Sequence, residues 1–208
     1  MELLNLKAIP IAHAKKVYSI SSKELKVIKK SKYRAPQHGH YLSQSIHLLN
    51  HKTLLPLKKF ILNKAKEYTR DVLEISEEIY MTQSWSTINT THAFHKPHSH
   101  PNTFISLVYY AHCPDGFLLF DLHTSSLREG FNFQYTINHF NIYNSAIWEL
   151  PVQTGDMVLF PGHIDHGSTP NKSTEPRIVI GANFFIKGKL GSEKFVDLIG
   201  VQPLDLKK

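Results

Sequence analysis

Three histidines and one arginine have a spacing that could hold a metal ion and an acid. His98 and His100 lie one residue apart, so on an extended segment both imidazoles point to the same face. A third imidazole must come from a strand that a closed sheet brings alongside, and His166, much later in the chain, offers it. Arg177 follows at the head of a long apolar strand. This order predicts a metal site beside a carboxylate-binding site.

The predicted ligand set departs from the commonest one for non-haem iron. Neutral imidazole binds iron, zinc, copper and nickel, and Fe(II) oxygenases usually combine two histidines with one carboxylate. Here His100 stands where the carboxylate is expected, which leaves the metal with one negative charge fewer. Asp121 and Asp165 are the alternative carboxylate ligands. His163 is the alternative to His166, although its surroundings indicate a loop.

Arg177 is the candidate for binding the acid. A guanidinium offers parallel donors that match a carboxylate, and a buried guanidinium is costly unless a carboxylate meets it. A bound dicarboxylic acid would satisfy it. The alternative is a surface arginine at the start of a strand.

The other histidines have simpler interpretations, because a chain with 14 histidines brings some of them together by chance. His92 and His95 flank the central pair and are candidates for contacts with the metal ligands. His123 follows an apolar segment and could face the cavity. Seven are expected on the surface or in loops: His13, His38, His40, His47, His51, His112 and His139.

The elements that must position these residues are short strands. They are rich in β-branched and aromatic residues and are separated by Gly, Pro, Asn or Asp. Many short strands without intervening helices favour a sandwich or jelly roll over a parallel α/β sheet. The expected strands are 79–88, 104–111, 116–121, 133–137, 146–150, 156–160 and 177–186.

The N-terminal part is expected to be helical and to support the sheet. Residues 5–12 indicate a short edge strand, Ser21 to Glu24 resembles a capping box that starts a helix, and 31–51 indicates a loop. One apolar stripe then predicts a second helix that packs on the sheet: Leu57, Phe60, Ile61, Ala65, Tyr68 and Val72. We expect residues 1–78 to pack on a core of 79–208 as one structural domain.

Composition limits the partners. Residues 1–80 hold 15 Lys and Arg against 7 Asp and Glu, so the net charge of +7 belongs to this part. This charge permits nucleic acid as a partner, although a solvated lysine-rich helix face is the favoured explanation. No segment is long and apolar enough for a membrane span, no signal-peptide pattern is present, and Cys113 is the single cysteine. A cytoplasmic location is therefore expected.

Beyond single residues, a series of motifs resembles the prolyl-hydroxylase-like 2OG-Fe(II) oxygenases, a family of 2-oxoglutarate/Fe(II)-dependent dioxygenases common in marine bacterial and phage genomes. Each motif is weak alone, but their order and spacing are specific and extend over nearly the whole chain. The motifs are Ser84-Trp85, His98-Ser99-His100-Pro101, Val108-Tyr109-Tyr110, Gly116 to Phe120, Leu159-Phe160-Pro161 with His166, and Arg177 to Asn183.

The resemblance implies a double-stranded β-helix fold and a role for each site residue. His98 and His166 would bind Fe(II), and His100 occupies the position of the usual acidic ligand. Arg177 would pair with the distal carboxylate of 2-oxoglutarate, and Tyr110 would donate its hydroxyl to the same group. The implied reaction uses 2-oxoglutarate and dioxygen, releases succinate and CO2, and oxidises a C–H bond of a main substrate.

Two other functions stay open at this point. A cupin-like protein with three histidines could bind a metal without 2-oxoglutarate, but it needs neither Arg177 nor Tyr110. A non-catalytic module could instead bind nucleic acid through the basic N-terminal part. The main substrate also stays open, and protein side chains, amino acids and nucleobases are all compatible with these motifs.

Overall fold

Two antiparallel sheets form the protein in the computed structural model, which describes residues 8–122, 136–191 and 199–203. The large sheet contains, in spatial order, β1 (Ala12–Ala14), β7 (Met157–Pro161), β4 (Ile105–His112), β9 (Arg177–Leu190), β3 (Glu78–Asn89) and β2 (His40–Leu42). A last strand, β10 (Ile199–Val201), pairs with the end of β9. The small sheet contains β6 (Ile147–Pro151), β5 (Phe117–Asp121) and β8 (Asp165–Ser168). This mainly β architecture agrees with the sequence.

The two faces of the large sheet have different surroundings along its central strands. Along β9, Ile178 and Ile180 pack in the core beneath the helices. The alternate residues Arg177, Val179 and Gly181 line a cavity on the opposite face. Because strand side chains alternate with period 2, one apolar run supplies both the supporting core and the wall of the cavity.

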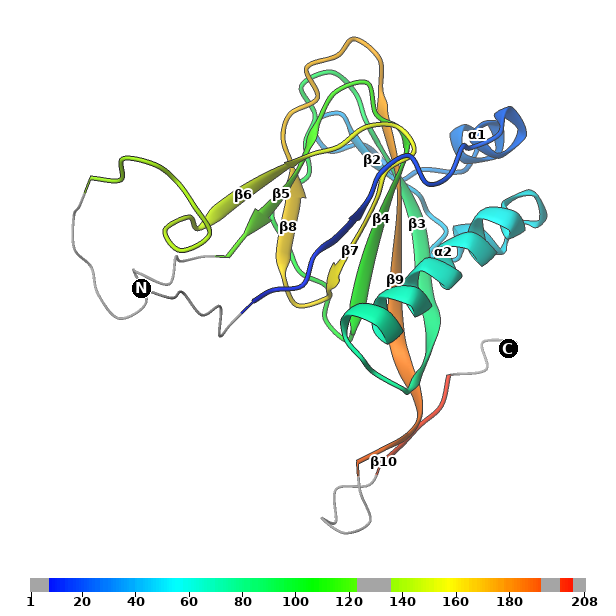
Figure 1. The fold of residues 1–208 in the computed structure, drawn as a ribbon. Helices are drawn as coiled ribbons and strands as arrows, with labels where there is room; N and C mark the ends of the chain where they lie inside the picture. The colour runs from blue at the N-terminus through cyan, green and yellow to red at the C-terminus, as the bar shows by residue number, and fades with distance from the viewer. Residues whose placement is uncertain (1–7, 123–135, 192–198, 204–208) are drawn as a thin grey trace.

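The helices cover the face of the large sheet that points away from the small sheet (Figure 1). They are α1 (Ser22–Lys29) and α2 (Leu55–Glu67), with short turns η1 (Leu48–Asn50) and η2 (Lys52–Leu54) and a π-helical end η3 (Tyr68–Val72). From the predicted stripe, Leu57, Ile61, Ala65 and Tyr68 are buried against the sheet. Phe60 is partly buried. The prediction is wrong for Val72, which is 50% exposed where the helix widens into its last turn.

The start of α1 confirms the predicted capping box. Ser21 Oγ accepts a hydrogen bond from the Glu24 amide, and Glu24 accepts one from the Ser21 amide. The Glu24 carboxylate also accepts a hydrogen bond from Tyr18 Oη at 2.8 Å. The cap therefore fixes both the start of the helix and its contact with the preceding segment.

Three sequence-based expectations need correction. The N-terminal edge strand lies at Ala12–Ala14, after Pro10, and residues 8–11 are not in a strand. The expected loop at 31–51 contains β2, which pairs with the end of β3. In the expected strand 133–137, residues 136 and 137 are not in a strand, and the others lie outside the described residues. The predicted boundary at residue 78, between the N-terminal supporting part and the β core, stays a prediction.

The strand β8 is absent from the list of expected strands, although the third histidine was expected to lie on a strand. Its residues are Asp165, His166, Gly167 and Ser168, which lack the apolar alternation that marks a strand. It exists because it pairs with β5 in the small sheet, and Phe120 lies opposite His166. This pairing places the third predicted metal ligand.

Candidate metal centre

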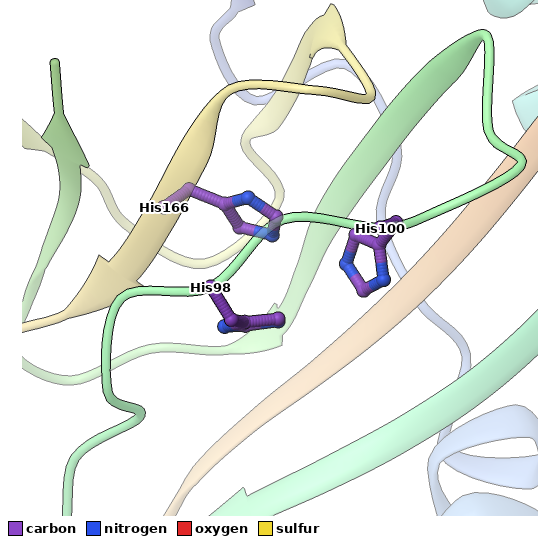
Figure 2. Close-up of side chains that lie close together, drawn as sticks. All are labelled: His98, His100 and His166. Atoms are coloured by element: carbon purple, nitrogen blue, oxygen red, sulfur yellow. The ribbon is translucent and has the colours of Figure 1, made fainter.

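Three imidazoles converge between the two sheets. His98 and His100 lie on the segment before β4 and His166 lies on β8, and their rings approach one another in Figure 2. One nitrogen from each ring lies within 4.8 Å of the others. Since metal–nitrogen bonds are about 2.0–2.2 Å long, small ring movements would bring all three nitrogens onto one ion.

Backbone pairing holds two of these residues in register. The amide of His98 donates to the His166 carbonyl at 3.0 Å, and the amide of His166 donates back at 2.9 Å. Gly167 permits this approach, because a Cβ there would lie 2.6 Å from the carbonyl oxygen of His95. The segment before β4 is thus attached to β8 at the two histidines themselves.

The same two rings are oriented as metal ligands. Nδ1 of His98 donates to the Lys96 carbonyl at 2.9 Å, and Nδ1 of His166 donates to the Ile164 carbonyl at 3.0 Å. A carbonyl can only accept, so the proton lies on Nδ1 and the lone pair on Nε2. A second hydrogen bond of this kind fixes the tautomer and the ring in metal-bound histidines.

Burial keeps two of the three imidazoles neutral. Desolvation lowers the pKa of His166 to about 3, and the neighbouring His98 and His100 add to that shift. Desolvation, with a contribution from His98, lowers the pKa of His100 to about 4. Neutral imidazole is the form that binds a metal ion, and three such ligands suit Fe(II). The residues present therefore fit a divalent metal.

Trp85 supports the third histidine. Its ring lies 5.2 Å from that of His100, centroid to centroid. On its other side Trp85 lies against Gly181, where a Cβ would come within 2.5 Å of the indole. The glycine on β9 therefore leaves space for the indole, whose plane is tilted by 51° from that of the His100 ring.

Arg177 is buried at the inner end of the same cavity and is only 1% exposed. Nη2 donates to the Thr169 carbonyl at 2.7 Å and to Ser168 Oγ at 3.0 Å, and Nη1 donates to the Asp115 carbonyl. Nε is buried and has no hydrogen-bond partner within the described part of the chain. A buried cationic donor without a partner is costly, so this atom indicates where an acid would bind.

Tyr110 lies in the same cavity and is 2% exposed. Burial raises the pKa of its phenol, while the nearby Arg177 opposes that rise. The hydroxyl therefore stays protonated and can donate a hydrogen bond. Tyr110 and Arg177 reach the cavity from the neighbouring strands β4 and β9.

The alternative ligands do not join the cluster. Within the described residues, the group that could hold a metal consists of His98, His100 and His166. Asp121 and Asp165 lie opposite each other on β5 and β8 and are not part of it. His163 is exposed in the turn before β8, and His123 lies outside the described residues.

Sequence reasoning missed the positions of Ser168 and His40 beside the site, whereas His95 was a candidate for contacts with the metal ligands. Ser168 was missed because it lies on β8. Its hydroxyl accepts hydrogen bonds from both Arg177 and the His95 amide. His95 lines the cavity and stacks on His98, with ring centroids 4.1 Å apart. His40 was expected on the surface or in a loop, but it lies on β2 and stacks on His95 at 4.4 Å. Only the tertiary fold brings these residues together.

The basic residues of the N-terminal part lie elsewhere. Lys23 and Lys26 of α1 and the following Lys30 line a groove with His51 and Thr53. Helix α1 lies on the side of the large sheet that points away from the small sheet (Figure 1), whereas His166 lies on β8 of the small sheet. The solvated lysine-rich face stays the favoured explanation of this surface, with nucleic acid as the untested alternative. No helix among the described residues is both long and apolar enough to cross a membrane.

One family model matches the part of the chain that contains this site. Residues 83–183 match the model of a family described as "Putative 2OG-Fe(II) oxygenase", and this range contains all five predicted site residues. None of the curated proteins matches the sequence. The match confirms the resemblance that the sequence motifs indicated.

Solved structures share the fold at low sequence identity. HygX from Streptomyces hygroscopicus, with nickel and 2-oxoglutarate bound, is 12% identical, with 85% of this chain and 82% of HygX covered and a TM-score of 0.56. A Pseudomonas putida prolyl-4-hydroxylase is 11% identical (86% and 94% covered, TM-score 0.56). A prolyl hydroxylase from Trichoplax adhaerens, in complex with a hypoxia inducible factor peptide fragment, is 12% identical (84% and 83%, TM-score 0.57). The predicted double-stranded β-helix is confirmed.

Proposed function

We propose that this chain, a 2OG-Fe(II) oxygenase over residues 83–183, binds its iron through His98, His100 and His166 and its 2-oxoglutarate through Arg177 and Tyr110. The observation that carries the assignment is that one cavity contains both the three imidazoles and a buried arginine with an unpartnered Nε. A metal site alone would not need the arginine, and an arginine alone would not need the imidazoles.

Different residues of the chain bind the metal and the co-substrate. Fe(II) and 2-oxoglutarate supply the activation of dioxygen, with oxidative decarboxylation to succinate and CO2 coupled to C–H oxidation, most simply a hydroxylation. His98 and His166 hold the metal through Nε2, because their Nδ1 atoms are already bonded to carbonyls. Arg177 and the protonated Tyr110 fix the far end of the dicarboxylate by charge-assisted and neutral hydrogen bonds.

His100 completes the site without adding charge. Where a carboxylate would neutralise part of the metal charge, this imidazole leaves the centre more cationic, which favours binding of the dianionic co-substrate. Its ring is held by Trp85 rather than by a carbonyl. His100 is thus the ligand with the most freedom to rotate.

The site also has a wall that excludes water from the co-substrate. Leu118 and Val158 belong to a buried cluster between the sheets that also contains Tyr110. Electrostatic interactions strengthen in such surroundings, because fewer water molecules screen them. The arginine and the co-substrate carboxylate would therefore meet in a partly dry environment.

The cupin alternative differs in one measurable respect. A three-histidine metalloprotein of that kind would bind a metal but would neither bind nor consume 2-oxoglutarate. The test supplies the Fe(II)-loaded protein with 2-oxoglutarate and dioxygen, without a main substrate, and measures succinate. We expect slow, iron-dependent succinate formation. Metal binding without any loss of 2-oxoglutarate would overturn the proposal in favour of the cupin function.

The main substrate and the location of the protein remain separate proposals. A protein side chain, an amino acid or a nucleobase would each provide an oxidisable C–H bond. The single cysteine supports a cytoplasmic location, since a reducing compartment needs no disulfide.

A further inference from the structure

A second, larger cleft adjoins the metal centre and shares His100 with it. Its volume is about 570 Å³, against about 50 Å³ for the cavity that contains Arg177. The inner cavity is therefore narrow, whereas the cleft is within the size range of small-molecule sites. Of these two spaces, the cleft is the one with room for a main substrate that must reach the metal.

The two spaces lie along one face of β9. Arg177, Val179 and Gly181 line the inner cavity, and the next residues on that face, Asn183 and Phe185, line the cleft. A strand rises by about 3.3 Å per residue, so Phe185 lies roughly 13 Å beyond Gly181, in the direction away from Arg177. The metal ligands lie between an inner site for the co-substrate and an outer site.

A β-bulge shapes the wall of the cleft. The register of β3 against β9 shifts between Met81 and Gln83, and Thr82 Oγ1 donates to the Asn183 carbonyl at 3.1 Å. Tyr80 and Gln83 are an odd number of residues apart, yet both line the cleft. The extra residue in the bulge makes this possible, and bulges commonly redirect side chains beside active sites.

The chemistry of the cleft is polar but uncharged. Among the described residues that line it there is no Asp, Glu, Lys or Arg. Gln83, Asn102 and Asn183 offer side-chain amides, which both donate and accept hydrogen bonds. Glu78 and Lys187, which lie opposite each other on β3 and β9 beyond Tyr80 and Phe185, form an ion pair at 2.5 Å. A charged ligand would find no oppositely charged side chain among the described residues that line the cleft, so the loss of its hydration would be poorly compensated.

One amide is already oriented by the protein. Asn183 is 3% exposed, and its Oδ1 accepts a hydrogen bond from Ser106 Oγ at 3.1 Å. This bond leaves the Nδ2 group for the cleft that Asn183 lines. The rings of Tyr80 and Phe185 provide flat apolar surface beside it. The cleft thus combines a fixed donor with aromatic faces.

We propose that this cleft binds the main substrate and selects a group that is uncharged, forms hydrogen bonds through an amide or hydroxyl, and presents a compact apolar ring or chain to Tyr80 and Phe185. The proposal rests on the proposed function, because it takes the metal at His100 as the point that the substrate must reach. It excludes substrates that enter the cleft with a phosphate, a carboxylate or an ammonium group.

A matched series of small probes tests this selection. N-acetylprolinamide is neutral, N-acetylproline carries a carboxylate and prolinamide carries an ammonium, while methyl glucoside tests a neutral sugar in place of an amide. Each is titrated by NMR into protein loaded with Zn(II) and 2-oxoglutarate, with backbone shifts as the readout. Binding of 2-oxoglutarate to the Zn(II) protein is measured first, so that failure of the proposed function is detected separately.

We expect shifts at cleft residues with N-acetylprolinamide, methyl glucoside or both, and none there with the two charged probes. Tyr80→Ala should weaken binding of the neutral probe by roughly fivefold to tenfold, because it removes an aromatic contact. Gln83→Glu should weaken it as well, and Gln153→Glu, an exposed change outside the cleft, should not. Three results would overturn the proposal. A charged probe could bind as well as the neutral ones, none of the four probes could bind, or the changes at Tyr80 and Gln83 could leave binding unaltered.

Discussion

Gly116 lies directly against the guanidinium of Arg177, so closely that a Cβ at position 116 would overlap Nη1. Gly116 precedes β5 of the small sheet and Arg177 opens β9 of the large sheet. The absence of a side chain on one sheet therefore makes room for the buried cation on the other. Position 116 is therefore a glycine because the Arg177 side chain occupies the space that a Cβ would fill.

The first prediction concerns that glycine. Gly116→Ala should displace the Arg177 side chain and weaken 2-oxoglutarate binding by about tenfold, which corresponds to part of one charge-assisted hydrogen bond. Iron affinity should stay unchanged, because the three histidines are not moved. Gly200→Ala is the control, since nothing lies within 4 Å of a Cβ there. Anaerobic calorimetry with each ligand measures both affinities, and an unaltered 2-oxoglutarate affinity would show that Arg177 does not contact the co-substrate.

Arg177 itself gives the second prediction. Arg177→Lys keeps the charge but removes the planar pair of donors, and it leaves the Thr169 and Ser168 acceptors without their present partner. We expect 2-oxoglutarate affinity to fall by about 1.5–3 kcal/mol, or roughly tenfold to a hundredfold, with iron affinity nearly unchanged. The measurement is the same pair of titrations. Loss of both affinities together would indicate a structural arginine.

The third prediction separates two histidines that are close in sequence. His166→Ala removes a buried imidazole that we propose as a metal ligand and whose Nδ1 is already held by a carbonyl, so iron binding and succinate formation should both be lost. His163→Ala changes an exposed ring in the preceding turn and should leave both intact. Equilibrium dialysis with Fe(II) under argon provides the comparison. Similar losses in the two variants would contradict the assignment of His166.

The sequence predicted the residues of the site more completely than the strands that carry them. His98, His100, His166 and Arg177 line one cavity, as their types and order suggested, together with Tyr110, which the family resemblance implied. A strand that carries the third histidine was required, but the bounds of β8 could not be predicted, because its residues take strand geometry from pairing with β5 rather than from their own preferences. The contacts of Ser168 were missed for the same reason.

The helical part shows a similar limit. The stripe on α2 predicted the buried residues because helical periodicity is a local property. It failed at Val72, where the α-helix gives way to a π-helical turn and the stripe rotates away from the sheet. The stacking of His40 on His95 depends on β2, a three-residue strand with no recognisable pattern. Tertiary pairing, not local sequence, decides such positions.

The fourth prediction tests the packing of α2 on the sheet. Ile61 is fully buried there, so Ile61→Ala should lower the free energy of unfolding by about 2–5 kcal/mol. Val72→Ala, a change in the same stripe at a 50% exposed side chain, should alter it by less than about 0.5 kcal/mol. Urea unfolding followed by circular dichroism gives both values. Equal effects would mean that the stripe does not support the sheet.

The most direct test of the central claim is an anaerobic spectrophotometric titration with Fe(II) and 2-oxoglutarate together. A 2-oxoglutarate molecule chelated to iron gives a metal-to-ligand charge-transfer band that neither component gives alone. The three histidines and Arg177 predict that this band appears in the wild-type protein, disappears in His166→Ala, and needs more 2-oxoglutarate in Arg177→Lys. A wild-type protein that binds Fe(II) without developing the band, or a band that persists in His166→Ala, would contradict the account.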